Sequence, residues 1–583
     1  MVAAADHYPR FLTQYLKPQR ARLVGLAVTL LSSIGLQILN PQVLRYFIDQ
    51  AVSGGPQSLL LRAAGLFVAV AIVRQGLAIA STYFSETVAW SATNQLRLDL
   101  ARHCLKLDLA FHKAHTPGEL VERVDGDVDA LSRFFSQFVI QVLGNALLLL
   151  GVVVVLFLED WRAGLALGLF TLTALGVLNG LRTIAVRPWH TYRQIAAEFY
   201  GFVVEHLNGR EDIRANGGGE YVMGRFYQLL QRWLPAFQQA RFSSTLLWGS
   251  SVGLFTVGNA IALAVGAYLW QQNAITIGTV YLLFYYANLL QDPIERIREE
   301  LEQLQQAEAS LQRIRELLTH SPSLRSAGQA VLPTQALSVK FDRIWFRYPE
   351  ETSGWSLQDL TFDLPAGQVL GLLGRTGSGK STLARLLLRL YEPQQGQIYL
   401  GGLPLQQVPP TDLPQQVGLV TQDVQLFQTT VRNNLTFFNS GADDSTLITL
   451  LEELGLMPWL QTLPQGLDTE LGPDGGGLSA GQAQLLAFAR VFLKNPGLVI
   501  LDEASSRLDP QTEQLIERAV DRLLAGRTAI IIAHRLKTVQ RADQILILDQ
   551  GQILEVGERQ RLEQSPSSRF TRLLTMGGWV ETW

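Results

Sequence analysis

Long uncharged apolar stretches in the first 300 residues constrain this chain more than any other feature. An α-helix needs about 20 mostly apolar residues to cross the hydrocarbon core of a bilayer. Six stretches approach that length: 22–48, 59–82, 135–158, 162–182, 244–270 and 275–297. Only Glu159, Asp160 and Trp161 separate the third stretch from the fourth, so these two form a tight hairpin. The first half of the chain therefore predicts a helical membrane domain.

The charges between these stretches predict an orientation. The short connections 53–58, 159–161 and 271–274 contain no Lys or Arg. The alternate segments are basic, with Lys17, Arg20, Arg97, Arg102, Lys106, Arg187, Arg210 and Arg214 among their residues. Because cytoplasmic loops carry the excess of Lys and Arg, we expect both termini and the soluble half in the cytoplasm. We therefore expect a multi-pass integral protein of a bacterial plasma (inner) membrane. The stretch 8–20 is polar and amphipathic, so we expect it to lie on the bilayer surface and not to be a signal peptide.

Composition excludes several other classes of protein. The formal net charge is −3, so no basic surface is expected to neutralise a nucleic-acid backbone, and nucleic acid is not an expected partner. Cys104 is the single cysteine, which excludes an intramolecular disulfide and a cysteine-based metal site. We expect Cys104 to be a small buried apolar residue.

Polar residues inside the predicted spans leave the substrate open. Arg74 lies well inside the second span, where an unpaired guanidinium costs a few kcal/mol. Arg74 could have a structural role, in an ion pair or in the lining of a cavity. Alternatively, it could contact an anionic part of a substrate. The scattered polar residues of the spans, which fit lipids, drugs and peptides equally well, are Gln37, Asn40, Asn145, Asn179 and Asn259.

The soluble half contains a phosphate-binding motif. Residues 374–381 match G-x-x-x-x-G-K-[ST] at every position, after the apolar strand 369–373 and before the helical run 382–390. The candidate nucleotide-binding residues here are Gly374, Arg375, Thr376, Gly377, Ser378, Gly379, Lys380, Ser381 and Thr382. Glycines let backbone N–H groups close around phosphates, Lys380 would neutralise the terminal phosphates, and Ser381 would bind Mg²⁺.

Two acids follow a second buried strand. Asp502 and Glu503 directly follow the apolar run 498–501. A strand of this kind delivers the carboxylates at its end to the sheet edge beside the phosphates. Asp502 is a candidate for the Mg²⁺ shell and Glu503 for the base that polarises the attacking water.

Shortly before that strand, Leu478-Ser479-Ala480-Gly481-Gln482 opens a helix, and with this motif the chain resembles the ABC transporter family over essentially its whole length. Six spans followed by this domain resemble an exporter-type half-transporter. The resemblance implies that Tyr348 stacks on adenine, that Gln422 senses Mg²⁺ and the membrane domain, and that His534 contacts the γ-phosphate. It also implies that the signature residues Ser479 and Gly481 bind ATP held by the opposite subunit. Gln482 of the same motif and Asp509, in a loop that crosses the dimer interface, are further candidate nucleotide-binding residues.

The resemblance carries a fold and a function. It implies an all-α six-helix membrane domain at 1–318, a linker at 319–336 and an α/β P-loop NTPase domain of the ABC type at 337–583. It implies an ATPase that uses ATP and Mg²⁺ to export a hydrophobic or amphipathic substrate, whether lipid, drug or peptide, by alternating access. The partner is a second half-transporter, in a homodimer or a heterodimer, within the lipid bilayer.

Two alternative functions use the same motifs, namely an ATP-gated membrane regulator and an importer built on the exporter fold. The sequence also departs from the family pattern at Ala480, where glycine is usual, and at Pro473, where the usual glutamate contacts short docking helices. Such helices are expected at the tips of the long connections 83–134 and 183–243, near residues 116–119 and 208–213, where solvated loops are the other reading.

Overall fold

The computed structural model describes residues 13–321, 330–351, 354–439, 441–472, 477–502, 510–533 and 536–575. It divides the chain into two compact units. One comprises Met1–Leu105 and Gly118–His320, and the other comprises Lys106–Pro117 and Ser321–Trp583. A short piece of the first long connection therefore belongs to the C-terminal unit.

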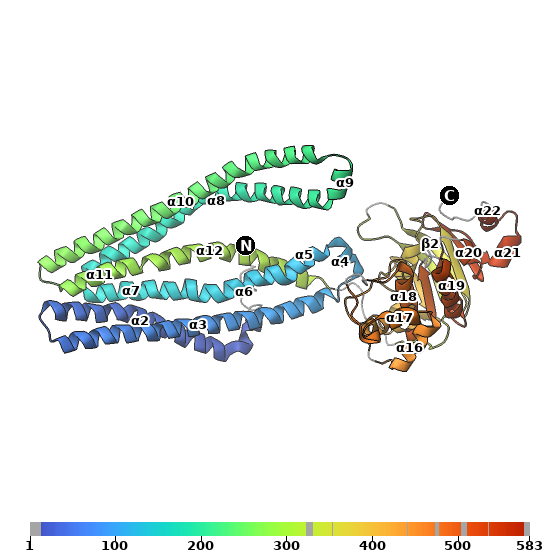
Figure 1. The fold of residues 1–583 in the computed structure, drawn as a ribbon, viewed down its shortest axis with the longest axis horizontal. Coiled ribbons are helices and arrows are strands. Elements are labelled where there is room, and N and C mark those ends of the chain that lie inside the picture. The colour runs from blue at the N-terminus through green and yellow to red at the C-terminus, as the bar shows by residue number, and fades with distance from the viewer. Residues whose placement is uncertain are drawn as a thin grey trace. The chain divides into compact units, whose positions relative to one another are not determined.

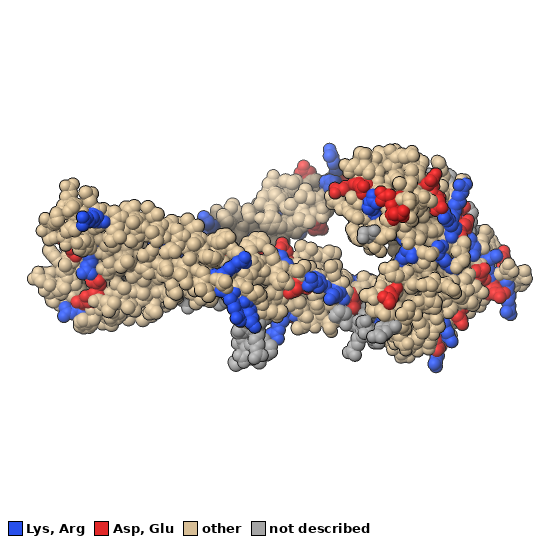
Figure 2. Space-filling model, turned by 90° about the horizontal axis from the view of Figure 1, so that it is seen from below, with Lys and Arg blue, Asp and Glu red and all other residues tan. Residues whose placement is uncertain are grey.

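The first unit is helical, and its longest helices run side by side in pairs, α2 with α3 and α8 with α10 (Figure 1). Its elements are η1 (Lys17–Gln19), α2 (Arg20–Val52), α3 (Gln57–Cys104), η2 (Glu122–Gly126), α6 (Asp127–Gln137), η3 (Phe138–Gly144), α7 (Asn145–Glu159), α8 (Trp161–Asn208), α9 (Arg210–Ala215), α10 (Gly219–Gln271), α11 (Ile277–Leu289) and α12 (Gln291–Thr319). The short helix α5 (Pro117–Val121) begins at the boundary between the units. Figure 2 shows few charged side chains along the long helices on the face it displays.

Polar side chains close the turns between these helices. The Asp160 carboxylate accepts a hydrogen bond from the backbone N–H of Arg162 and caps α8, which makes the predicted hairpin between α7 and α8. Asp49 of α2 accepts from the backbone N–H of Gly278 at 2.9 Å and from the Thr276 hydroxyl at 2.8 Å. These bonds hold the end of α2 beside the start of α11.

Five helical segments of the described residues are long and apolar enough to span a membrane, and they cover five of the six predicted stretches. The sixth stretch, 275–297, is divided between α11 and α12 at Leu290. The long connections are helical, as expected, because α3, α8 and α10 continue far beyond their apolar stretches. Short helices lie at both tips, α5 in the first connection and α9 in the second. Cys104 is buried, as predicted. Of the amphipathic stretch 8–20, residues 8–12 lie outside the described residues.

The C-terminal unit is built on two sheets. The larger has the strand order β10-β9-β3-β8-β7-β6, in which only β10 is antiparallel to its neighbour, and the smaller has the order β2-β1-β4-β5. The strands are β1 (Val339–Phe346), β2 (Leu357–Leu364), β3 (Val369–Gly374), β4 (Gln395–Leu400), β5 (Leu403–Pro404), β6 (Val417–Val420), β7 (Leu498–Asp502), β8 (Thr528–Ile532), β9 (Gln544–Asp549) and β10 (Gln552–Glu558). The helices are α4 (Leu109–Ala114), α13 (Lys380–Leu387), η4 (Leu405–Gln407), α14 (Leu413–Gln416), α15 (Val431–Thr436), α16 (Asp444–Glu453), α17 (Met457–Thr462), η5 (Gly466–Asp468), α18 (Ala480–Lys494), α19 (Pro510–Leu524), α20 (Leu536–Val539), α21 (Arg559–Gln564) and α22 (Arg569–Thr575).

Each face of the larger sheet packs into its own hydrophobic core. Along β3, Val369 and Leu373 belong to one core, while Leu370 and Leu372 belong to the other. This alternation follows from the opposite directions of successive side chains in a strand. Burial on both faces fixes the strand register, and the register in turn fixes which residues meet at the end of the sheet.

Candidate functional site

The carboxyl ends of four parallel strands bring the predicted nucleotide residues to one edge of the larger sheet. Leu372 of β3 pairs with Ile532 of β8, and the same Ile532 pairs with Asp502 of β7. Adjacent strands lie about 4.8 Å apart, so the ends of β3 and β7 are about 10 Å apart with β8 between them. Strand β6 pairs with β7 on its far side, which brings the loop that carries Gln422 to the same edge.

The loop after β3 has the form of a phosphate cradle. Gly377 and Gly379 adopt φ angles of +82° and +108°, which side chains with a Cβ rarely adopt. The Lys380 ammonium, 5% exposed, donates to the carbonyl oxygens of Gly374 at 2.6 Å and Arg375 at 2.9 Å. The loop thus bends over the lysine at the start of α13.

The hydroxyls of this loop differ in their surroundings. The Ser378 hydroxyl is buried and has no hydrogen-bond partner among the described residues, so a group with acceptor or donor atoms would satisfy it. Ser381 is exposed at the start of α13, while Thr382 is buried and bonds to Tyr348. A buried orphan hydroxyl and a buried ammonium inside a glycine loop fit a polyphosphate chain.

Tyr348 is held firmly, and its ring is covered. The side chain is 9% exposed, its hydroxyl lies 3.0 Å from the Thr382 hydroxyl, and Arg385 donates to it at 2.9 Å. In the same unit, the Lys113 ammonium of α4 sits 4.5 Å from the centre of the Tyr348 ring. Stacking of a base on this face of the ring requires Lys113 to move away.

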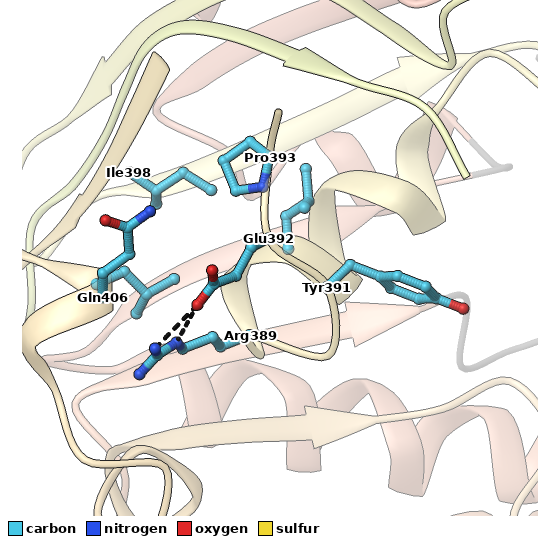
Figure 3. Close-up of a pocket in the computed structure, with 8 residues that line it drawn as sticks. Arg389, Tyr391, Glu392, Pro393, Ile398 and Gln406 are labelled. Atoms are coloured by element: carbon cyan, nitrogen blue, oxygen red, sulfur yellow. Dashed lines mark hydrogen bonds and ion pairs between the residues drawn. The ribbon is translucent and has the colours of Figure 1, made fainter. Parts of the chain in front are cut away.

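A small cavity behind α13 is structural and not a nucleotide site (Figure 3). Its volume is about 10 Å³, which holds at most one water molecule. The buried Arg389 donates to the Glu392 carboxylate at 2.9 Å and to the Val408 carbonyl at 2.8 Å. Tyr391 points away from this ion pair in Figure 3, and its ring meets the Tyr348 ring edge-on at 5.2 Å. Burial, with a smaller effect of the Glu350 charge, raises the pKa of Tyr391.

We expect Lys113→Ala to strengthen ATP binding about two- to fivefold, because a cation held over an exposed aromatic face contributes about 0.5–1 kcal/mol and competes with the base for that face. Equilibrium binding of a fluorescent ATP analogue to the purified chain measures the change. Lys106→Ala, in the same segment, is the matched control and should leave the affinity unchanged. Equal or weaker binding by Lys113→Ala would contradict the competition.

The Leu478–Gln482 motif forms a helix cap. The Ser479 hydroxyl accepts from the backbone N–H of Gln482, and the Gln482 side chain accepts from the backbone N–H of Ser479. Ser479 is exposed at the N-terminus of the 15-residue α18, whereas Gly481 is buried. The free N–H groups and the dipole of a helix start favour an anion at this point.

Arg490 ties α18 to the loop that contains Gln422. Its guanidinium donates to the carbonyl of Gln425 at 3.0 Å, to the carbonyl of Asn434 at 2.7 Å and to the Asn434 side chain at 3.2 Å. Burial lowers the pKa of Arg490. Gln422 itself is exposed three residues earlier. The helix that begins with Ser479 and the loop after β6 therefore share one buried hydrogen-bond network.

We expect Arg490→Ala to lower the thermal unfolding midpoint of the C-terminal unit by about 5–10 °C, because it removes three hydrogen bonds of a charged, half-buried side chain, each of which contributes about 1–3 kcal/mol. Thermal unfolding of the purified chain followed by differential scanning fluorimetry measures the shift. Arg522→Ala removes an exposed ion pair with Glu453 and should change the midpoint by no more than about 2 °C. Equal shifts in both variants would show that the network does not stabilise the unit.

Several residues singled out in the sequence lie outside the described residues, namely Glu503, Asp509, His534 and Pro473. The structure brings together the glycine loop, Asp502 and the loop of Gln422, while Ser479 starts a separate helix. Sequence reasoning missed Lys113, Arg385 and Arg490. None of these three residues lies in a recognisable motif. The weak signal available was that each is a charged residue close in sequence to a predicted site or docking tip.

Comparison with known proteins shows which proteins share this architecture. The family model of the ABC transporter transmembrane region matches residues 23–294, and that of the ABC transporter ATP-binding domain matches residues 357–506. The uncharacterized ABC transporter ATP-binding protein YknV of Bacillus subtilis is 29% identical, over 94% of this chain and 91% of its own length. An ATP-dependent lipid A-core flippase of Ralstonia nicotianae is 28% identical, over 95% of this chain and 94% of its own length.

A solved structure of a bacterial Atm1-family ABC exporter with ATP bound superposes with a TM-score of 0.81 at 26% identity. The match covers 96% of this chain and 99% of that one. Both domain types therefore occur here in the order of an exporter. The chain belongs to the ABC transporter family, as a multi-pass, ATP-hydrolysing half-transporter of the exporter type.

Proposed function

We propose that this protein exports a hydrophobic or amphipathic substrate from the cytoplasm across a bacterial plasma membrane, as one half of a dimer. One observation carries the proposal: a glycine loop, the Asp502 carboxylate and the loop of Gln422 share one sheet edge, in a chain that also holds helices long and apolar enough to span a membrane. The domains we assign are the membrane domain at 1–318, a linker at 319–336 and the nucleotide-binding domain at 337–583. Both termini lie in the cytoplasm because the connections on that side carry the basic residues.

The nucleotide site uses residues of this edge. The backbone of residues 374–382 holds the phosphates, Lys380 turns from the loop carbonyls to the terminal phosphates, and Tyr348 receives the adenine. Mg²⁺, held by Ser381, Asp502 and Gln422, neutralises charge on the phosphates when it is bound. Glu503 orients the attacking water and accepts its proton, and His534 contacts the γ-phosphate.

Dimerisation completes the site. Ser479 is exposed at a helix start, and within the described residues its hydroxyl bonds only to Gln482. The α18 terminus is therefore available to phosphates from outside the chain. With Gly481, Gln482 and Asp509 it faces the ATP of the partner half-transporter, which is a second copy or a related chain. ATP then favours the closed dimer because it binds that state more tightly than the open one.

The relatives support an amphipathic substrate. Several proteins that match this chain over more than 90% of its length are named ATP-dependent lipid A-core flippases. A chain with the same layout and charge-poor helices is suited to move a molecule that is partly soluble in lipid. We therefore place lipids and lipid-like amphiphiles ahead of drugs and peptides as substrates.

Transport in sealed vesicles tests the proposal. The purified protein is reconstituted with its ATPase domain outward, and a fluorescent phospholipid analogue is supplied in the outer leaflet. ATP added outside should move the analogue to the inner leaflet, and subunit analysis of the same sample identifies the partner. In matched vesicles that carry the analogue in the inner leaflet, ATP-driven movement to the outer leaflet would indicate an importer. ATP hydrolysis that moves no amphiphile in either preparation would indicate a regulator, and either result overturns export.

A further inference from the structure

A cavity of about 330 Å³ lies within the first unit, between α2, α3, the π-helical turn η3 with α7, and the junction of α11 and α12. We call it the inner cavity. Six of its polar lining residues matter here: Gln37, Arg74, Ser81, Asn145, Asp292 and Arg296. They come from four separate helical segments of the first unit. A π-helical turn in a wall is itself a feature that is frequent at functional sites.

The two arginines of the inner cavity lie at a similar depth along the helices. The Arg45–Glu159 ion pair at 2.6 Å joins the end of α2 to the end of α7, and the bond from Gly278 to Asp49 joins α2 to α11. At 1.5 Å per residue, Arg74 lies about 26 Å from the start of α3, and Arg296 about 28 Å from the start of α11. The two guanidiniums are thus at about the same level.

Arg74 has no hydrogen-bond or ion-pair partner among the described residues, although it is half-buried inside an apolar span. Other arginines of this unit are paired: Arg45 with Glu159, and Arg313 with the buried Asp127. Arg296 donates only to the neutral Gln141 side chain, at 3.2 Å. Within the described part of the chain, no carboxylate therefore contacts either guanidinium. A charge inside a membrane is costly unless an ion or water meets it.

Ser81 supplies an independent sign of a ligand. Its side chain is 3% exposed, lines the inner cavity, and has a hydroxyl with no partner among the described residues. It follows Arg74 by seven residues, two helical turns, so both lie on the same face of α3. A buried hydroxyl beside an unpaired guanidinium is suited to the oxygen atoms of an anion.

The rest of the lining decides what kind of anion fits. Leu30, Ile34, Ile140 and Leu148 line the same cavity, so apolar groups surround the polar cluster. The Asp292 carboxylate is the one acidic side chain that lines the inner cavity, against two guanidiniums. The net charge of the lining side chains is positive, and the apolar side chains around them suit a hydrocarbon chain. This combination selects a molecule with one anionic headgroup and an apolar tail.

We propose that the inner cavity binds the phosphate headgroup of an anionic amphiphile, with Arg74 as its main cation and Arg296 and Ser81 as further donors. The inference rests on the proposed export function, since it names the class of substrate for that function. Asp292 lowers the affinity of the same site for an anion, because its carboxylate repels the headgroup.

Binding of fluorescent phosphatidic acid to the detergent-purified full chain tests this assignment. Arg74→Gln should weaken binding about tenfold, Arg74→Lys should retain most of it, and Asp292→Asn should strengthen it about two- to fivefold. Arg62→Gln changes an exposed arginine of the same helix outside the cavity and should bind like the unaltered chain. The thermal unfolding midpoint of Arg74→Gln should not fall, because the change removes an unpaired charge.

Competition separates the sources of the phosphate. Unlabelled phosphatidic acid should displace the probe, whereas phosphatidylcholine and inorganic phosphate at millimolar concentration should not. Equal binding by Arg74→Gln and the unaltered chain, or equal displacement by phosphatidylcholine, would overturn the anionic site. Displacement by inorganic phosphate would show a site for the free ion and overturn the amphiphile. These binding results are independent of ATP-driven movement in vesicles, so failure of the inference and failure of the export proposal are distinguishable.

Discussion

Replacing Glu503 with Gln should leave ATP binding intact and reduce ATP turnover about 100-fold or more, because the amide keeps the shape of the carboxylate but cannot accept the proton of the attacking water. Glu503 directly follows Asp502, which lies at the end of β7 level with Leu372 of β3 across a single strand. The chain direction thus delivers Asp502, the residue directly before Glu503, to the edge where the glycine loop begins. Phosphate release by the purified homodimer, measured beside equilibrium ATP binding, reports both halves of the prediction.

The matched control is Glu452→Gln, which makes the same chemical change at an exposed position of α16 in the same unit. It should hydrolyse ATP at the rate of the unaltered chain. Near-normal turnover by Glu503→Gln would reject its role as the base. Loss of ATP binding in that variant would instead point to a structural function of the carboxylate.

Local patterns predicted most of the fold. Hydropathy identified the spans, since crossing a bilayer requires long apolar helices whatever the tertiary structure. It did not show that the stretch 275–297 is divided at Leu290, because apolar side chains continue through the break. The available signal was Pro293, which has no N–H for a helical hydrogen bond and lies just after the start of α12.

The site was predictable where a motif is local and unpredictable where contacts are distant. The glycine loop follows from its own eight residues, because backbone conformation and charge there are set by neighbours in sequence. The position of Lys113 over Tyr348 arises from packing of α4 in the C-terminal unit, where Leu109 and Ala110 join its core. The inner cavity likewise joins helices that are distant in sequence, so the sequence indicated Arg74 as unusual but gave neither Ser81 nor Arg296 as its neighbours.

A mixed dimer should recover nucleotide trapping that both parent variants lose. Lys380→Ala removes the ammonium that would meet the terminal phosphates. Ser479→Asp keeps the cap of α18, because Asp caps a helix as well as Ser does, but sets a carboxylate against the phosphate of the partner's ATP. In a symmetric dimer with shared sites, both lesions of the mixed dimer fall in one site, so vanadate-trapped nucleotide should return to about half the level of the unaltered dimer.

The experiment uses two affinity tags, so that only dimers with one chain of each variant are recovered. Ser479→Thr retains both the hydroxyl and the cap, and as a homodimer it should trap nucleotide like the unaltered chain. If each chain instead built its whole site from its own residues, every chain of the mixed dimer would carry one damaged site. Mixed dimers would then trap no more nucleotide than their parents. The N-terminus of α18 at Ser479 would in that case need a function within its own subunit.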